Sequence, residues 1–260
     1  MILDREKPII GMVHLKPLPG TPDFTGDFEA VLARAVEDAQ ALEAGGVDGA
    51  LVQNRWDRAI PKQHAGAETI VAMTRIAQAI RRAVHVAVGV HVLRNDVVAS
   101  LAIAALCGGS FVRAAALTGA SWTSQGIVEP NTIEILHERR RIGAGQVMLL
   151  ADIWSMHYHP IVPVAPGQLA ADARAAGAAG VVIAVPDADE TRTMIGTIRS
   201  VVGRFPILLG GYTSVDTIAG LLEVADGAIV GGAFENAAQD RRVVVERVRR
   251  FVAAARGSAG

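Results

Sequence analysis

His14 and Asp152 are the two residues best placed for proton transfer in this chain of 260 residues. His14 follows the apolar segment Ile9–Val13, and Asp152 follows Val147–Ala151. Histidine titrates near neutral pH, and a carboxylate that ends an apolar strand is costly unless it is paired or used. These positions predict general acid–base catalysis shared by the two side chains.

Two glycine pairs in the last third of the chain predict a phosphate site. Each pair, Gly210 with Gly211 and Gly231 with Gly232, follows a short apolar segment. Glycine lets backbone N–H groups approach an anion closely, and a helix N-terminus after each pair would add partial positive charge. Glycine also ends helices and relieves crowding, but these pairs follow predicted strands, so we expect all four to hold a phosphate.

Charged and amide side chains end other apolar segments. Arg113 stands inside a predicted strand and needs an anion, which Asp152 or a substrate phosphate would supply. One of Asn95 and Asp96 is expected to cap the next helix, which leaves Arg94 to face the site.

His157 and His159 have a spacing that can be met in an extended metal-binding segment. No acidic residue lies beside them, so we predict no metal and no cofactor, with a metal-dependent hydrolase as an alternative. Asn54 and His157 complete the predicted catalytic set. The predicted substrate-binding residues are Arg94, Asn95 and Arg113.

Short β-branched segments alternate with longer, Ala-rich amphipathic segments along the whole chain. This alternation predicts a parallel sheet whose strands are joined by helices. The eight predicted strands are Pro8–His14, Gly49–Gln53, Val84–Val90, Ser110–Ala115, Gln146–Ile153, Gly180–Val185, Pro206–Gly210 and Gly227–Val230. Eight units predict an α/β fold that closes into a single (β/α)8 TIM barrel over residues 1–260, with a doubly wound open sheet as the alternative.

Active sites of such barrels lie at the carboxyl ends of the strands. The predicted polar residues gather at these ends, whereas the opposite ends offer little beyond Asp48, His85 and Asp226. Three long loops follow strands on the same side, and we expect them to cover a ligand. They are Leu15–Gly26, Gln53–Gly66 and Leu117–Pro130.

Two helices have clear predicted limits. Asp27 can cap the first, and Gly45 with Gly46 would stop it. The last is expected from Asp240 to Arg256, with Gly257–Gly260 as a frayed end.

The composition narrows the class of protein. The formal net charge of -1 argues against a nucleic-acid partner. The sequence has no run of 18 apolar residues, so we expect no membrane span. The charged first residues do not resemble a signal peptide, and the single Cys107 excludes an internal disulfide. We therefore expect a cytoplasmic protein that binds a small phosphorylated metabolite and forms a homo-oligomer.

Several segments together resemble one family. They are Ile10–Gly20, Glu43–Gly49, Val92–Asp96, Leu117–Ala120 with Gln125–Ile127, Ala151–Asp152 and Ala225–Gly231. These segments, spread over nearly the whole chain, resemble the BtpA family, also called BtpA/SgcQ. The resemblance implies a ribulose-phosphate-binding type of TIM barrel. It also implies two different roles, one in photosystem I assembly or stability and one as an enzyme of sugar metabolism.

The chain departs from the family pattern after three strands. Gln53 stands where the family usually has Glu, and Trp154 and Met156 replace a histidine and a lysine. The segment Val185–Asp189 stands where a Ser/Thr-Gly segment is usual. These departures imply either a different substrate or binding without catalysis.

The sequence therefore favours an enzyme that acts on a phosphorylated sugar or a nucleotide-like metabolite. Isomerase, lyase and glycosidic hydrolase chemistry are all compatible with the predicted residues, although a clear carboxylate pair for hydrolysis is missing. The alternative is a non-catalytic, BtpA-like protein for assembly, stability or ligand binding.

Overall fold

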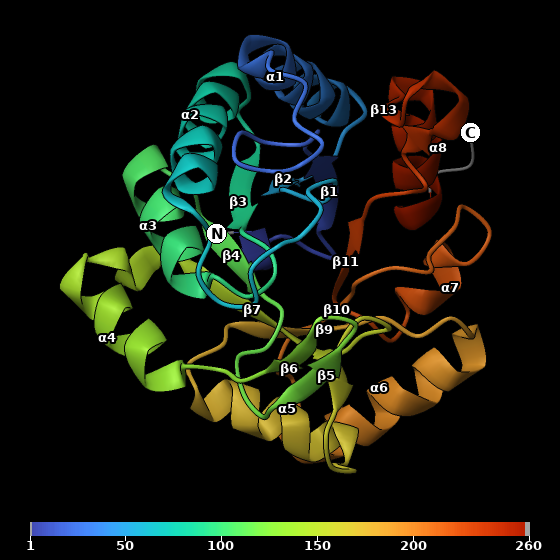
Figure 1. Ribbon diagram of the computed structural model, residues 1–260. Coiled ribbons are helices and arrows are strands. Elements are labelled where there is room, and N and C mark those ends of the chain that lie inside the picture. Colours follow the sequence, from blue (N-terminus) through green and yellow to red (C-terminus); the bar gives the residue numbers. More distant parts are fainter. Residues whose placement is uncertain (1, 258–260) are drawn as a thin grey trace.

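Eight parallel strands close into a barrel in the computed structural model, which describes residues 2–257 (Figure 1). Around the barrel the strands follow the order β1-β11-β10-β9-β7-β4-β3-β2. Their bounds are β1 (Ile9–His14), β2 (Gly49–Gln53), β3 (Ala87–His91), β4 (Phe111–Ala114), β7 (Met148–Trp154), β9 (Gly180–Ile183), β10 (Ile207–Leu209) and β11 (Gly227–Val230). The predicted (β/α)8 barrel is confirmed, and the open sheet is excluded. The predicted strand limits differ from these by up to three residues, the largest shift being at the start of β3.

Helices surround the barrel and follow its strands (Figure 1). They are α1 (Phe28–Ala44), α2 (Ala67–Ala83), α3 (Val97–Cys107), α4 (Thr132–Arg141), α5 (Pro166–Ala175), α6 (Ala188–Val202), α7 (Ile218–Leu221) and α8 (Val245–Ala255), with short 3-10 turns η1 (Ile2–Asp4), η2 (Ala144–Gln146) and η3 (Ala237–Gln239). The predicted limits of α1 are confirmed, because the Asp27 side chain accepts a hydrogen bond from Ala30 N and Gly45 ends the helix.

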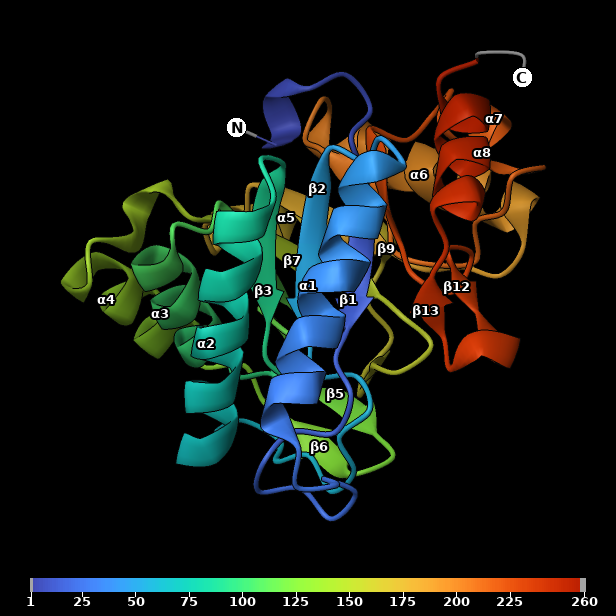
Figure 2. The same cartoon turned by 90° about the horizontal axis from the view of Figure 1, so that it is seen from above.

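The strands bury both faces, as parallel barrel strands must. Along β1, Ile10 and Met12 belong to the core inside the barrel, whereas Ile9 and Val13 pack in the larger core beneath the helices. Ile2 of η1 joins the inner core, so the N-terminal segment closes one end of the barrel. Figure 2 shows η1 at the end opposite to strands β5 (Ser121–Thr123) and β6 (Gly126–Val128).

Two small antiparallel sheets lie at the end of the barrel opposite to η1, where the carboxyl ends of the strands are. Strand β5 pairs with β6 and with β8 (His159–Pro160), which joins the loop after β4 to the loop after β7. Strand β12 (Glu235–Asn236) pairs with β13 (Arg242–Val243) after β11. These strands have only two or three residues, too few to show a periodic pattern in the sequence.

The β12–β13 hairpin corrects the predicted start of the last helix. Asp240 lies in the hairpin turn with a φ of 53°, and it forms ion pairs with Lys16 and Arg34. The helix therefore starts at Val245 instead of Asp240. Gly257 follows it in a turn, and residues 258–260 of the predicted frayed end lie outside the described residues.

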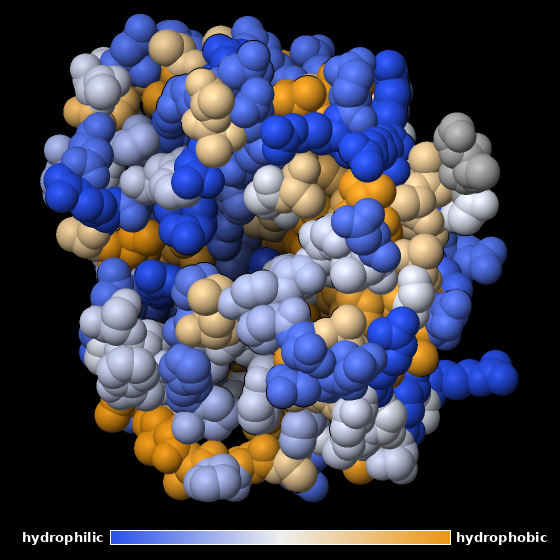
Figure 3. All heavy atoms as spheres, turned by 90° about the vertical axis from the view of Figure 1, so that its right-hand side faces the viewer, coloured by the Kyte–Doolittle hydropathy of each residue, from blue (hydrophilic) through white to orange (hydrophobic). Residues whose placement is uncertain are grey.

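Hydrophilic side chains cover much of the face seen in Figure 3, and the hydrophobic ones occur in separate patches, one of them along the lower edge. Across residues 2–257, none of the helices combines the length and the apolar character that a membrane span requires.

Candidate active site at the carboxyl end of the barrel

A cavity of about 280 Å³ opens among residues at the carboxyl ends of the barrel strands and their loops. This volume is near the lower limit for small-molecule sites. Nine of the predicted site residues line it: His14, Arg94, Arg113, Asp152, His157, Gly210, Gly211, Gly231 and Gly232. The remaining two, Asn54 and Asn95, do not line it.

His14 is held by a carboxylate that the sequence analysis did not select. Its Nδ1 lies 2.5 Å from Oε1 of Glu235, whose side chain is almost fully buried. Burial would raise the pKa of Glu235, but the hydrogen bond and charge of His14, together with nearby arginines, outweigh burial and lower it. Glu235 is therefore ionised near neutral pH, and Nδ1 of His14 donates its hydrogen to it. The lone pair of the neutral ring is then on Nε2.

Two further contacts fix the imidazole of His14. The ring of Trp56 meets it edge to face, with ring centroids 6.4 Å apart, and the guanidinium groups of Arg55 and Arg241 lie over Trp56 at 5.1 and 4.9 Å. On the other side, a Cβ added to Gly231 would lie only 2.7 Å from Cε1 of His14. Glycine at this position is thus required to leave room for the histidine. With Nδ1 bound to Glu235, Nε2 is the ring nitrogen available to a ligand in the cavity.

Asp152 forms an ion pair with Arg113, one of the two partners expected for that arginine. Nε of Arg113 lies 3.0 and 3.1 Å from the two carboxylate oxygens, and Nη2 lies 3.0 Å from Oδ1. Burial raises the pKa of Asp152, and the charge and hydrogen bonds of Arg113 act against that rise. The guanidinium of Arg113 also lies close to Gly210, the residue after β10. A Cβ added to Gly210 would lie 3.3 Å from Nη2 of Arg113.

The glycine pairs lie at the cavity, but their donors differ from the expected set. The N–H of Gly210 donates to the carbonyl of Ile183 at 2.7 Å, so it continues the barrel and is not available to an anion. The N–H groups of Gly211, Gly231 and Gly232 make no hydrogen bond to any other described residue. Three backbone donors, rather than four, are therefore available at the cavity, and the loops that carry them are the candidate phosphate position.

The expected helix N-termini do not follow the glycine pairs directly. Helix α7 begins only at Ile218 and has four residues, and α8 begins at Val245, after the β12–β13 hairpin. Helix ends attract anions only within about one turn. Positive charge for a bound phosphate must therefore come from the side chains of the cavity.

His91 lines the cavity and is almost fully buried, with 3% of its surface exposed. The amide Nε2 of Gln53 donates to its Nδ1 at 3.0 Å, and its own Nε2 has no hydrogen-bond partner among the described residues. Burial, and then the charges of Arg113 and Arg94, lower the pKa of His91 well below 6.5. The ring is thus neutral at pH 7, with its single hydrogen on the unpartnered Nε2.

Asn54 and Asn95 are structural residues. Asn54 donates to Asp57 and accepts from the N–H of Leu93, so it ties together the loops after β2 and β3. Asn95 makes two hydrogen bonds with the backbone of Ala116. Both amides are buried and brace the loops, and neither lines the cavity, so their predicted catalytic and substrate-binding roles stay predictions without support from the cavity. The predicted cap of α3 is Asp96, whose side chain accepts from Ala99 N.

The two histidines after β7 lie in different surroundings. His157 lines the cavity, and its pKa is lowered by burial and by the nearby arginines Arg55, Arg94 and Arg113. His159 pairs with β5 and packs on Trp122, with ring centroids 6.1 Å apart. Among residues 2–257, no group of three or more His, Cys, Asp and Glu side chains is arranged to hold a metal ion.

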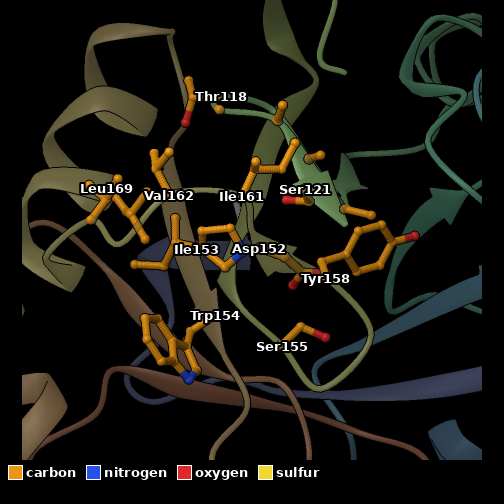
Figure 4. Close-up of a pocket in the computed structure, with 16 residues that line it drawn as sticks. Thr118, Ser121, Asp152, Ile153, Trp154, Ser155, Tyr158, Ile161, Val162 and Leu169 are labelled. Carbon is orange, nitrogen blue, oxygen red and sulfur yellow. The ribbon is translucent and has the colours of Figure 1, made fainter. Parts of the chain in front are cut away.

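A second cavity of about 70 Å³ adjoins the first, because Asp152, Ser155 and Tyr158 line both. Figure 4 shows these residues together with the largely apolar remainder of its lining, which includes Ile153 and Leu169. Asp152 therefore lies between a polar cavity and a smaller apolar one.

The fold and the site define a (β/α)8 barrel with a polar, arginine-rich cavity at the carboxyl ends of its strands. The chain belongs to the BtpA family, whose model matches residues 5–257. The predicted family is thus confirmed.

Relatives within the family carry different descriptions. The photosystem I biogenesis protein BtpA of Synechocystis sp. is 34% identical over 235 residues, which cover 88% of this chain and 80% of that protein. The putative sgc region protein SgcQ of Escherichia coli is 34% identical over 154 residues, 58% of this chain and 56% of that protein.

Solved structures show the same fold at low identity. The KDPGal structure superimposes with a TM-score of 0.60 and 15% identity, covering 98% of this chain and 97% of that chain. Orotidine 5'-phosphate decarboxylase from Pyrococcus horikoshii gives a TM-score of 0.59 and 12% identity, covering 96% and 99%. Identities this low establish a shared TIM-barrel fold and nothing finer.

Proposed function

We propose that this protein is an enzyme that moves a proton on a small phosphorylated metabolite. The observation that carries the proposal is the His14–Glu235 pair, with Nδ1 and Oε1 2.5 Å apart at the edge of the cavity. A histidine whose Nδ1 is held by a carboxylate presents a basic Nε2 in a fixed direction. Nε2 of His14 is then the base that takes the proton.

The phosphate of the substrate would bind the N–H groups of Gly211, Gly231 and Gly232. Because Gly231 packs directly against His14, a phosphate at this position lies close to the base. Arg113, held in place by Asp152, would supply positive charge beside Gly210.

The neutral His91 suits the other half of such a reaction. When a base removes a proton from the carbon next to a carbonyl group, negative charge develops on the carbonyl oxygen. Nε2 of His91 is buried and has no partner among the described residues, and its N–H would donate to that oxygen when a ligand reaches it. His14 and His91 would then act as base and hydrogen-bond donor, with the Asp152–Arg113 pair as a second proton-carrying group.

This arrangement favours isomerase or lyase chemistry over glycosidic hydrolysis. A glycosidase needs two carboxyl groups for the acid and for the base or nucleophile. Here Glu235 is bound to His14 and Asp152 to Arg113, so these two carboxylates do not form such a pair.

A second function, in assembly, has one specific observation in its favour. The relative from Synechocystis sp. is a photosystem I biogenesis protein. A protein of that kind needs no base at the cavity, so the two functions differ in what the His14–Glu235 pair does.

Hydrogen exchange in deuterium oxide tests the proposal without knowledge of the product. The protein is incubated with a panel of phosphorylated ketoses and aldoses, and NMR follows deuterium that enters the carbon next to the carbonyl group. We expect exchange with at least one compound, and its loss in His14→Ala. Ligand-induced thermal stabilisation without any exchange would favour a non-catalytic binding protein. Exchange that persists in His14→Ala combined with Asp152→Asn would contradict the assigned roles.

A further inference from the structure

Two arginines line the cavity without a carboxylate partner. Arg55 follows β2 and Arg94 follows β3, and neither forms an ion pair with any residue in the described part of the chain. Nε of Arg94 donates to the neutral amide oxygen of Gln125 at 3.1 Å, and the guanidinium of Arg55 lies over Trp56. By contrast, Arg58 and Arg113 each bind an aspartate.

The two unpaired arginines oppose each other electrostatically. Burial, and then the positive charge of Arg94, lower the pKa of Arg55. Arg94 also acts on His91 and His157, so its charge reaches into the cavity. The negative charge of Glu235 acts against this fall in the pKa of Arg55, but Glu235 is itself bound to His14. No carboxylate pairs directly with either arginine within the described residues, and a bound anion would relieve the cost of these like charges.

Arg94 is far around the barrel from the candidate phosphate position, whereas Arg55 follows β2, two strands from β11. The strand order β1-β11-β10-β9-β7-β4-β3-β2 puts β3 and β10 on opposite sides of the ring. The glycine donors follow β10 and β11, and Arg94 follows β3. A phosphate bound to the glycines therefore leaves the guanidinium of Arg94 to bind a different group.

We propose that the substrate carries two anionic groups, a phosphate on the Gly211, Gly231 and Gly232 donors and a second acidic group on Arg55 and Arg94. This inference rests on the proposed function, because it takes the glycine loops as the phosphate site. The second group is a phosphate or a carboxylate, since guanidinium groups bind both through paired N–H donors. The reacting carbon atoms lie between the two groups, within reach of His14 and His91.

Calorimetric titration with three six-carbon compounds tests the proposal. Glucose 6-phosphate has one anionic group, fructose 1,6-bisphosphate has two phosphates, and 6-phosphogluconate has a phosphate and a carboxylate. We expect at least one of the two doubly anionic compounds to bind the wild-type protein at least tenfold more tightly than glucose 6-phosphate does. Which of the two binds better identifies the second group.

Variants separate the two ends of the ligand. Arg55→Gln combined with Arg94→Gln should abolish the tenfold preference and leave glucose 6-phosphate binding within about twofold. Arg58→Gln, whose arginine pairs with Asp23 and does not line the cavity, is the matched control. Gly232→Asp, where an added Cβ meets no atom within 4 Å, should weaken all three ligands by placing a carboxylate at the phosphate position.

The outcomes distinguish the two hypotheses. Equal binding of the three compounds to the wild-type protein, or a preference that survives the double arginine variant, would overturn the second anionic site and leave the phosphate site standing. Binding that Gly232→Asp leaves unchanged, or no binding of any of the three, would overturn the phosphate site and with it this inference. Unchanged thermal stability of the double arginine variant would verify that it is folded.

Discussion

The two ends of the barrel differ in how completely their charged groups are paired within the protein. At the end closed by Ile2, the buried carboxylate of Asp48 accepts from the N–H of Ile9 at 2.9 Å and pairs with Arg5 and Arg256, each at 3.3 Å. Asp226, near the same end, binds Arg199 and accepts from the N–H of Ile207. Both aspartates predicted at this end therefore have their charge compensated within the protein.

At the other end, several groups have no partner within residues 2–257. They are the guanidinium charges of Arg55 and Arg94, which have no carboxylate partner, together with Nε2 of His91, Oγ1 of Thr213 and the N–H groups of Gly211, Gly231 and Gly232. Unsatisfied polar groups lower stability, so their concentration at one end indicates a place where a ligand completes the structure. The unpaired groups at the carboxyl end support the proposed binding site there, whereas the charges at the other end stabilise the fold.

The largest expected effect is on turnover. Replacing His14 with Asn removes the basic Nε2 and should lower kcat by about 10²- to 10⁴-fold, the usual contribution of a general base. Asp226→Asn, at the other end, should leave kcat unchanged. Steady-state rates on the substrate identified by hydrogen exchange provide the measurement. An equal loss of kcat in the two variants would contradict the proposed functional difference between the two ends of the barrel.

Stability should show the reverse pattern. Asp48→Ala leaves the buried N–H of Ile9 without an acceptor and should lower the free energy of unfolding by about 1–3 kcal/mol. Arg94→Gln removes an unpaired charge at the ligand-binding end and should change it by less than about 0.5 kcal/mol. Urea denaturation measures both. A larger loss for Arg94→Gln than for Asp48→Ala would mean that the arginine is structural.

A smaller effect is expected from filling space beside His14. In Gly231→Ala the new Cβ would lie 2.7 Å from Cε1 of His14, so the imidazole must move. A displacement of this kind should lower kcat/KM by about tenfold or more. Gly196→Ala in α6, where an added Cβ meets no atom within 4 Å, is the control. Unaltered kcat/KM in Gly231→Ala would show that the position of His14 is not critical.

The smallest effect concerns pH. Because the pKa of folded His91 lies well below 6.5, the unfolded chain binds a proton near pH 6.5 that the folded protein does not bind. The free energy of unfolding should therefore fall as the pH decreases below about 6.5. The pKa of His157 is also lowered, so His157 contributes a decrease of the same sign. The contribution of His91 is therefore the decrease in the free energy of unfolding of the wild-type protein minus the decrease in His91→Gln. An identical decrease in both, measured by urea denaturation at pH 7.5 and 5.5, would contradict a neutral, buried His91.

The fold was predictable because eight strand–helix units leave a strong, repeated pattern. His14, Asp152 and the glycine pairs were predictable for a related reason: each comes directly after an apolar segment of the sequence, and the carboxyl ends of such strands meet at one end of a barrel. The cost of a charge inside a barrel strand also predicted an anionic partner for Arg113, and Asp152 was one of the two partners expected.

Other features of the site depend on contacts that spacing does not encode. Glu235 lies 221 positions from His14, and only the β12–β13 hairpin brings it to the imidazole. Its one sequence signal is a carboxylate three residues after Gly232, at the end of an apolar strand. The role of Asn54 was hard to predict because an amide at a strand end serves equally well as a ligand contact or as a loop brace. In the structure its side chain accepts from the N–H of Leu93 and donates to the carboxylate of Asp57, as a loop brace does.

The most direct test of the central claim, that the carboxyl end of the barrel is an anion site, is a crystal structure with selenate. Selenate is a tetrahedral dianion like phosphate, and its anomalous scattering locates it independently of the surrounding density. We expect an anomalous peak inside the cavity, with oxygens about 2.7–3.2 Å from the backbone nitrogens of Gly211 and Gly232. Selenate bound elsewhere on the protein, with none in the cavity, would contradict the account.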